Sequence, residues 1–270
     1  MTTTPIFSTK VESMPVTVYN NNTEVGQAAA ADAVEYLKQV LKERGHANVI
    51  LATGNSQLTF LETLRQSTEI DWSKINFFHM DEYINLPSGH PASFPLFLQR
   101  HFLDHLEPKA GAFYPVPGLH TKPGETLEQA AGLMEYENLL REYPADLCAL
   151  GIGENGHLAF NDPPFADFND PVWVKTIKLD ERSRKQQLGE GHFPDLESVP
   201  THAITLTIPA LLAARKVLAI VPEQRKADAV RKSLTGPIDA NCPASILREH
   251  AHVHLYLDRD SASLTYELQG

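Results

Sequence analysis

The chain has 270 residues, with 34 acidic and 23 basic side chains and a formal net charge of −11. A chain of this length can bury a large core as one or two domains without stabilising disulfides or metals. The acid excess argues against nucleic acid or an anionic membrane surface as a partner, because phosphate backbones are bound by basic surfaces. It leaves a small anionic ligand open, since a few local donors are enough to bind one.

The cysteine content and the N-terminal segment indicate the compartment. Cys148 and Cys242 are the two cysteines, and in such a cysteine-poor chain two reduced thiols are favoured over one disulfide. The opening segment MTTTPIFSTK has neither the basic nor the apolar region of a signal peptide, and the apolar runs are too short to cross a membrane. A cytoplasmic protein is therefore expected.

Short apolar runs alternate with longer amphipathic segments along the chain, which predicts strands alternating with helices. In chain order we expect strand 16–19, helix 25–44, strand 48–52, helix 56–66, strand 75–79, helices 93–103 and 125–142, strands 146–150, 174–178, 203–206 and 217–221, helix 226–234 and strand 253–257. The pattern predicts an α/β fold: a three-layer, Rossmann-like, mostly parallel sheet with helices on both faces, as a single domain over 1–270. Ligands bind at the carboxyl ends of such strands.

The loop after strand 48–52 contains Thr53, Gly54, Asn55 and Ser56. Small residues that open a helix after a strand form an anion-binding cradle, because backbone N–H groups face the ligand. The loop lacks the lysine of a P-loop and the glycine spacing of a dinucleotide fingerprint. The alternative is a plain turn with Ser56 as the N-cap of the helix.

Two adjacent acids, Asp81 and Glu82, follow strand 75–79. A carboxylate at the end of a buried strand is well placed to act as a general base. The alternative is a solvated turn. Two adjacent acidic residues alone do not distinguish a general base from a solvated turn.

The loop after strand 146–150 gives the strongest signal. Its sequence GIGENGHLAFND contains three glycines, which allow close approach of a ligand, followed by His157 and, five residues later, Asp162. An imidazole with a nearby carboxylate has a fixed tautomer and a tuned basicity. By contrast, the sequence has no C-x-x-C or H-E-x-x-H metal motif and no G-x-S-x-G nucleophile motif. We expect His250, His252 and His254 to be structural or surface residues.

Five segments together resemble the glucosamine-6-phosphate deaminase/isomerase family, which belongs to a wider group with 6-phosphogluconolactonases and ribose-5-phosphate isomerases. The segments are LATGNSQ (51–57), FFHMDEYINLP (77–87), GIGENGHLAFNDPP (151–164), HAITLTIPALLAARKVLAIV (202–221) and EQRKA (223–227). The resemblance spans about 25–257. The lactonases typically continue after Gly-His toward Ser-Leu-Phe-Pro, which this sequence lacks.

The resemblance implies a role for each matching residue. Asp81 is the base that carries a proton between sugar carbons 1 and 2, and His157 assists ring opening. Asp162 or Asn155 fixes the tautomer of His157. The phosphate is bound by Thr53, Gly54, Asn55, Ser56 and Lys226. Further candidate site residues are Glu82, Gly156, Arg182 and Arg184.

Two positions depart from the family pattern. Asp162 stands where the family usually has glutamate, so its carboxylate reaches about 1.5 Å less far. Gln187 stands where members often place an arginine on the phosphate, and Arg182 or Arg184 could replace that arginine.

The expected function is the deaminating isomerisation of a hexosamine 6-phosphate, glucosamine 6-phosphate foremost, to a ketose 6-phosphate and ammonia. No cofactor or metal is expected. The expected partner is a sugar phosphate, not nucleic acid or a membrane, and self-association is left open. The alternatives are a 6-phosphogluconolactonase-like hydrolase, an aldose–ketose isomerase without deamination, and a non-catalytic sugar-phosphate sensor. Galactosamine 6-phosphate is an alternative substrate.

Overall fold

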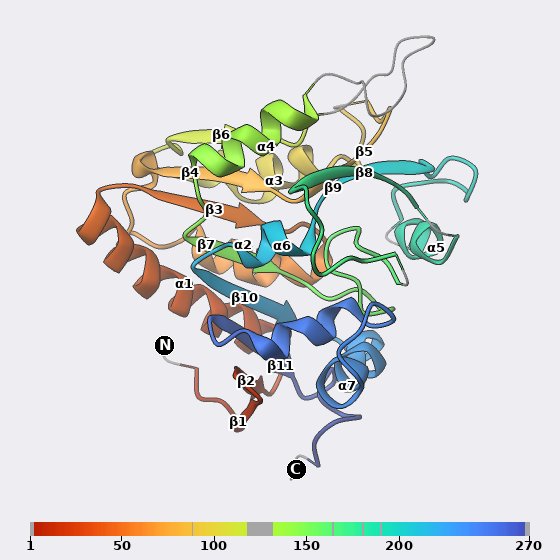
Figure 1. Ribbon diagram of the computed structural model, residues 1–270. Helices are drawn as coiled ribbons and strands as arrows, with labels where there is room; N and C mark the ends of the chain where they lie inside the picture. Colours follow the sequence, from red (N-terminus) through yellow and green to blue (C-terminus); the bar gives the residue numbers. More distant parts are fainter. Residues whose placement is uncertain are drawn as a thin grey trace.

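The computed structural model describes residues 3–87, 89–117, 132–163, 165–179, 181–189 and 191–267, without the side chains of Arg182 and Gln186. Its main sheet is built from β1 (Phe7–Val11), β2 (Met14–Tyr19), β3 (Ala47–Leu51), β4 (Ile75–His79), β6 (Ala112–Tyr114), β7 (Leu147–Leu150), β10 (Lys216–Val221) and β11 (Val253–Asp258). The strand order is β1-β2-β11-β10-β7-β3-β4-β6, from bottom to top of Figure 1. The β1–β2 pair is antiparallel and the other pairs are parallel.

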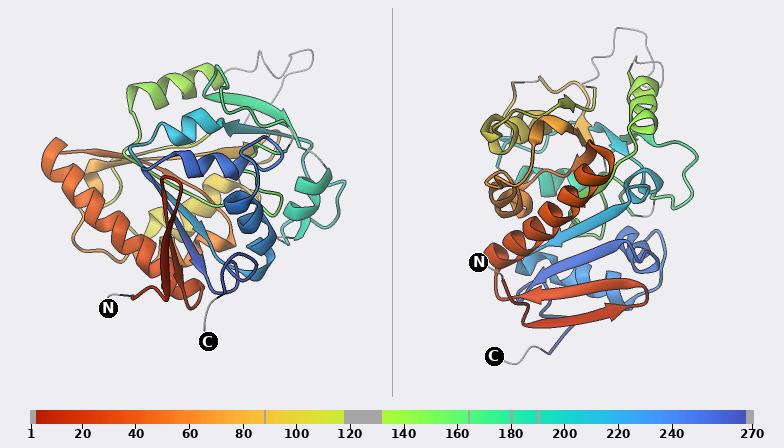
Figure 2. Two further views of the ribbon diagram at one scale, coloured as in Figure 1. Left: turned by 60° about the horizontal axis from the view of Figure 1, so that its bottom comes forward. Right: turned by 90° about the vertical axis from the view of Figure 1, so that its left-hand side faces the viewer.

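Helices cover both faces of this sheet, as Figures 1 and 2 show. One face packs against α1 (Asn22–Arg44), α2 (Leu58–Leu64) and α3 (Phe94–His101), and the other against α4 (Leu133–Glu142), α6 (Ile208–Leu212) and α7 (Ala227–Thr235). Side chains alternate along a strand, so in β3 Val49 and Leu51 join the first core while Ile50 joins the second. The expected three-layer α/β fold is confirmed.

A second, three-stranded sheet lies beside the main one. It consists of β5 (Asp81–Tyr83), β9 (His202–Leu206) and β8 (Val174–Lys178), and both of its pairs are antiparallel. The helix α5 (Glu181–Gly189) follows β8. Segments 174–178 and 203–206 are strands, as expected, but they belong to this small sheet. The two acids expected in a loop lie in β5, because β5 follows β4 after one residue and pairs with β9.

The other predicted elements agree with the structure to within a few residues at most boundaries. For the expected helix 125–142, the structure shows α4 from Leu133, and residues 125–131 lie outside the described part. Strands β1 and β6 and helices α5 and α6 were missed. The helix α5 (ERSRKQQLG) is rich in charged residues and has no apolar stripe, so hydrophobic periodicity does not predict it. Within the described residues, no helix is long and apolar enough to cross a membrane.

The topology creates a crevice between the ends of β3 and β7. These strands are neighbours in the sheet, with Leu51 opposite Ala149. After β3 the chain moves outward to β4, whereas β10 lies on the other side of β7. The loops that leave β3 and β7 therefore diverge, which is the arrangement that opens a ligand site in sheets of this class.

Candidate active site

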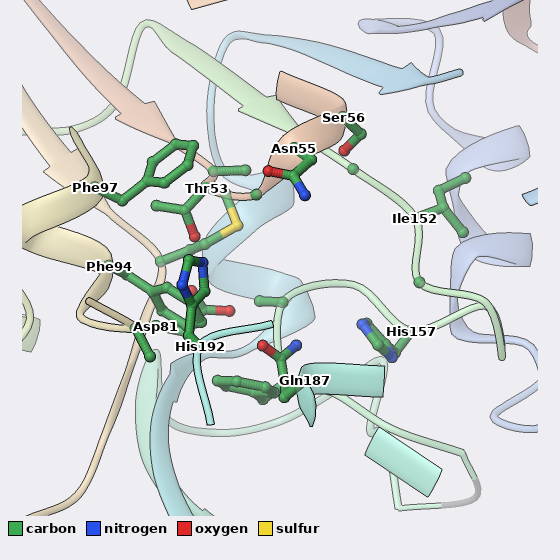
Figure 3. Close-up of a pocket in the computed structure, with 18 of the residues that line it drawn as sticks. Thr53, Asn55, Ser56, Asp81, Phe94, Phe97, Ile152, His157, Gln187 and His192 are labelled. Atoms are coloured by element: carbon green, nitrogen blue, oxygen red, sulfur yellow. The ribbon is translucent and has the colours of Figure 1, made fainter. Parts of the chain in front are cut away.

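A cavity lies at the carboxyl ends of the central strands, and all three loops singled out in the sequence contribute to it (Figure 3). The predicted residues that line it are Thr53, Gly54, Asn55, Ser56, Asp81, His157 and Lys226. In Figure 3, Asn55 and Ser56 lie at the top of the view, Asp81 on the left, and Gln187 and His157 below. The site is thus assembled from segments more than 150 residues apart in the chain.

The loop after β3 turns sharply into a short helix. Gly54 has φ 101°, a conformation that favours glycine, and its carbonyl accepts a hydrogen bond from the Gln57 N–H at 3.0 Å. Residues Asn55–Gln57 form one 3₁₀ turn that leads into α2. Ser56 makes no capping hydrogen bond, so the alternative of a simple N-cap at Ser56 is wrong. Its side chain lines the cavity instead.

Lys226 reaches the cavity from the turn after β10. Lys226 is buried, with only 6% of its surface exposed. The turn is held by Glu223, whose backbone has φ 86° and whose N–H donates to both carboxylate oxygens of Asp258 at 3.0 and 3.1 Å. Arg225 lies beside it in the lining, 2.6 Å from the Glu223 carboxylate and 3.4 Å from that of Glu154. The ammonium group of Lys226 therefore supplies positive charge at a position from which water is largely excluded.

Asp81 and Glu82 are both buried but have different surroundings. Asp81 lines the cavity and is 8% exposed. Burial raises the pKa of Asp81 to about 8, and the negative charge of Glu82 adds to this rise. Glu82 accepts hydrogen bonds from the Tyr83 N–H at 2.7 Å and from Ser93 Oγ at 2.8 Å, at the start of α3. Burial nevertheless raises the pKa of Glu82. Asp81 is therefore the carboxyl that faces the cavity, and Glu82 anchors β5 to α3.

His157 and Asp162 form a buried pair. Nδ1 of His157 lies 3.0 Å from Oδ1 of Asp162, so the shorter side chain of aspartate still reaches the histidine. The ring of His157 lies flat over Gly153, where a Cβ atom would overlap it, so only glycine fits there. Burial acts to raise the pKa of Asp162. Its contact with His157 and the hydrogen bonds from Ser183 and Asn155 outweigh this effect and hold that pKa below its usual range.

Asn155 and Ser183 fix this pair from two sides. Asn155 donates to Asp162 at 2.9 Å through Nδ2 and accepts the His157 backbone N–H at 3.0 Å through Oδ1. Ser183, on α5, donates to the same oxygen of Asp162 at 2.6 Å. Gly156, with φ 88°, makes the turn that leads into His157. Asn155 therefore acts on His157 through Asp162 and through the backbone.

The arginine candidates on α5 differ from Gln187. The guanidinium of Arg184 donates to the carbonyls of Leu196 and Val199, so it holds the loop that follows α5. The side chain of Arg182 lies outside the described part of the structure. Gln187 lines the cavity, and its Oε1 accepts a 2.6 Å hydrogen bond from the Tyr83 hydroxyl. Among the described side chains, the α5 residue that lines the cavity is thus a neutral amide.

Sequence reasoning missed one wall of the cavity. This wall is mostly apolar and consists of Met80, Pro91, Ala92, Phe94, Phe97, Phe160, His192 and Phe193. Pro91 and Ala92 precede α3, Phe94 and Phe97 lie in α3, and His192 and Phe193 follow α5. The segment EGHF at 190–193 combines glycine with aromatic side chains, a signal that could have been used. Among the described residues, no cluster of three or more histidine, cysteine or acidic side chains could hold a metal ion.

Comparison with known proteins gives a consistent picture for the whole chain. The family model for glucosamine-6-phosphate isomerases/6-phosphogluconolactonase matches residues 20–256. A glucosamine-6-phosphate deaminase of Exiguobacterium sibiricum is 35% identical over 244 residues, covering 89% of this chain and 90% of the relative. A glucosamine-6-phosphate deaminase of Bacillus cereus is 33% identical over 231 residues, covering 86% and 83%.

Solved structures agree with this at the level of the fold. A monomeric glucosamine-6-phosphate deaminase superposes with a TM-score of 0.80 at 30% identity, covering 92% of this chain and 99% of that one. A 6-phosphogluconolactonase of Trypanosoma brucei has a TM-score of 0.74 at 18% identity, covering 93% and 98%, which shows a shared fold alone.

Proposed function

The chain belongs to the family of glucosamine-6-phosphate isomerases and 6-phosphogluconolactonases, and we propose that it acts as a hexosamine-6-phosphate deaminase. The substrate proposed is glucosamine 6-phosphate, and the products are fructose 6-phosphate and ammonia. One observation carries this proposal. The same cavity is bordered by residues 53–56, called here the anion loop, by a buried carboxyl at Asp81 and by the His157–Asp162 pair. These three parts match the three tasks of the reaction.

The first task is to anchor the phosphate, which carries nearly two negative charges. The loop from Thr53 to Ser56 offers backbone N–H groups and a hydroxyl, and Lys226 offers the countercharge. The hexose then extends from this end of the cavity toward the carboxyl groups. Because the anchor is bound before and during the chemical step, it contributes mainly to affinity.

The second task is to open the pyranose ring. A base takes the proton of the C1 hydroxyl and an acid returns one to the ring oxygen. In this proposal His157 serves here, because its Nδ1 faces Asp162 and its side chain lines the cavity, and we assign the exchange of protons with the sugar to Nε2. The ionised Asp162 stabilises the imidazolium that forms when His157 takes the proton. Asn155 keeps both groups in place.

The third task is proton transfer between C2 and C1 of the open-chain sugar. Asp81 removes the C2 proton while the C1 oxygen takes up a proton from water, which gives an enolamine. Asp81 then returns its proton to C1, which gives a ketimine. Water then adds at C2 and the C–N bond breaks, so that ammonia leaves and the ketone forms. Burial makes Asp81 an unusually strong carboxylate base, which suits a weakly acidic C–H bond. No step is a redox step, so the proposal includes no cofactor.

The test is a side-by-side assay of the purified protein on glucosamine 6-phosphate, galactosamine 6-phosphate and 6-phosphogluconolactone. We expect ammonia and a ketose phosphate from glucosamine 6-phosphate, with Asp81→Asn at least about 10²-fold slower but still able to bind the sugar phosphate. The matched control is Asp260→Asn, at an exposed aspartate, with unchanged turnover. Loss of lactone without ammonia would identify a hydrolase, and a ketose formed without ammonia an isomerase. Binding without turnover would identify a sensor.

The proposal extends to the setting of the enzyme. It works in the cytoplasm as a single domain over residues 1–270, with a sugar phosphate as its ligand. A homo-oligomer is the alternative to the monomeric state of the structural relative. Analytical ultracentrifugation with and without substrate distinguishes the two states.

A further inference from the structure

Gln57 lies beneath the anion loop with its side-chain amide fully buried. The residue is 1% exposed. Its Nε2 lies 3.1 Å from the backbone carbonyl of Ile220, in β10, and 3.2 Å from Oγ of Ser56. Gln57 therefore connects β10 of the main sheet to the hydroxyl of Ser56 in the anion loop.

The orientation of this amide follows from its partners. The carbonyl of Ile220 can only accept a hydrogen bond, so the group 3.1 Å away from it must be the NH₂ of Gln57. The opposite orientation would place two oxygens in contact. The same nitrogen has a second N–H, which is donated to Ser56 Oγ. Ser56 is then the acceptor in this contact, and its own hydroxyl hydrogen is left to point elsewhere.

The space around the hydroxyl gives that hydrogen one direction. Gly151, at the end of β7, lies against the pair: a Cβ there would be 3.2 Å from Nε2 of Gln57 and 3.7 Å from Oγ of Ser56. Protein atoms thus occupy this side, and the side chain of Ser56 lines the cavity on the other. The hydroxyl can donate into the cavity, where the proposed phosphate would lie.

The hydrogen-bonding capacity of this amide is only partly satisfied. Its Oε1 is buried and has no hydrogen-bond partner among the described residues. The unpaired Oε1 costs free energy that offsets part of what the two Nε2 hydrogen bonds contribute. Residues that leave a buried polar atom unpaired are concentrated at functional sites.

We propose that Gln57 is a positioning residue that holds the Ser56 hydroxyl as a hydrogen-bond donor to the substrate phosphate. The identity of the ligand as a sugar phosphate rests on the proposed function. The contact between the two side chains does not. Gln57 touches Ser56, not the substrate, so its effect passes entirely through that hydroxyl.

The experiment is a double-mutant cycle on Gln57→Met and Ser56→Ala. Methionine keeps the length of the side chain and removes both N–H donors. We expect each single variant to raise KM for glucosamine 6-phosphate about tenfold with kcat within about twofold, because anchoring is shared by ground and transition states. The double variant should be no worse than Ser56→Ala alone. Effects that multiply in the double variant would overturn the proposal, and so would an unchanged KM in Gln57→Met.

Stability separates positioning from a structural role. Gln57→Met should change the melting temperature by only a few degrees, because it removes the unpaired Oε1 together with the hydrogen bond to the Ile220 carbonyl. A large drop that parallels the loss of affinity contradicts the proposal. Gln57→Leu is the second variant if methionine prevents folding, with the same expectation for KM. Lys226→Ala sets the scale for losing a phosphate contact, and Gln66→Met, at an exposed glutamine beyond α2, is the matched control with unchanged KM.

A binding measurement keeps this inference independent of the reaction. The Kd for inorganic phosphate is measured by calorimetry on the same variants. If the wild type releases no ammonia, the proposed deaminase function fails, whereas a non-additive weakening of phosphate binding in the cycle still supports the role of Gln57. If phosphate binding is unchanged in Gln57→Met, the role of Gln57 is refuted, whatever the reaction.

Discussion

At the scale of single residues, the site buries two neighbouring carboxyl groups, an arrangement that does not favour folding. Asp81 is 8% exposed and Glu82 is 4% exposed, and both are carboxyls on adjacent positions of β5. Burial raises the pKa of each group, because the ionised form loses its hydration. Glu82 is compensated by donors at the start of α3, whereas Asp81 faces the cavity. The free-energy cost of burying Asp81 is therefore consistent with its proposed role as a base.

This cost gives a pH-dependent prediction. The folded-state pKa of Asp81 is raised from 3.8 to about 8, so between these values the folded protein holds a proton that the unfolded chain has released. The stability that this bound proton contributes is therefore lost progressively as the pH rises from 3.8 to about 8. Asp81→Asn removes the effect. We expect its melting temperature to be close to that of the wild type near pH 5 and several degrees higher at pH 8.

The measurement is thermal unfolding by circular dichroism at a series of pH values. Asp260→Asn is the control, since its side chain is exposed and should give no pH-dependent difference. If Asp81→Asn and the wild type differ equally at pH 5 and pH 8, Asp81 is not titrating as described.

At the scale of elements, α5 connects the ligand to the His157–Asp162 pair. Ser183 and Gln187 are four residues apart, so they lie on the same face of the helix. One donates to Asp162, and the other lines the cavity with its carbonyl held by Tyr83. A ligand that contacts Gln187 therefore acts on the same helix that holds the acid–base pair.

Removing the hydroxyl of Ser183 should disturb that pair. Ser183→Ala takes away a donor that lowers the pKa of Asp162, so that pKa rises. Asp162 is then neutralised at a higher pH, and we expect the acid limb of the kcat profile to move to higher pH. A hydrogen bond to a charged group contributes about 1.5–3 kcal/mol, so kcat should fall by about tenfold or more.

The check is a pH–rate profile for Ser183→Ala beside Lys185→Ala. The side chain of Lys185 is 62% exposed on the same helix, so its variant should keep the wild-type profile. A lower kcat with an unmoved acid limb would mean that Ser183 matters for packing alone.

At the scale of the whole molecule, the two helical layers share one sheet. Strand β3 gives Val49 and Leu51 to one core and Ile50 to the other, so neither layer keeps its core if the sheet separates. The charge of −11 is a property of this whole surface. The cavity differs from this surface in having two cationic side chains, Lys226 and Arg225, in its lining, and the proposed phosphate site depends on this local positive charge.

The shared sheet predicts one cooperative unfolding transition. The two tryptophans report on different regions: Trp72 is buried in the core beside α1 and α2, and Trp173 precedes β8 of the small sheet, with Arg141 over its ring. In Trp173→Phe and in Trp72→Phe, the remaining tryptophan's fluorescence should change at the same denaturant concentration as the circular dichroism. Midpoints that differ between the two probes would indicate two independently folding units.

The sequence by itself determined most of the central sheet and the three loops of the site. Apolar runs such as VLAIV at 217–221 predict buried strands on their own, and the carboxyl ends of parallel strands meet at one edge, so the loops after β3, β4 and β7 had to converge. The resemblance to a known family added the roles of Asp81 and His157. Both kinds of inference depend on residues close together in the chain.

The tertiary structure decided what depends on contacts between distant segments. It alone placed Gln57 under Ser56 through the carbonyl of Ile220, and Ser183 on Asp162. It assigned the acids to a strand of a second sheet, because β5 finds its partner β9 more than 100 residues later. A hydrogen bond between residues 163 positions apart leaves no local pattern in either segment, so the sequence could name the participants in the chemistry but not the residues that orient them.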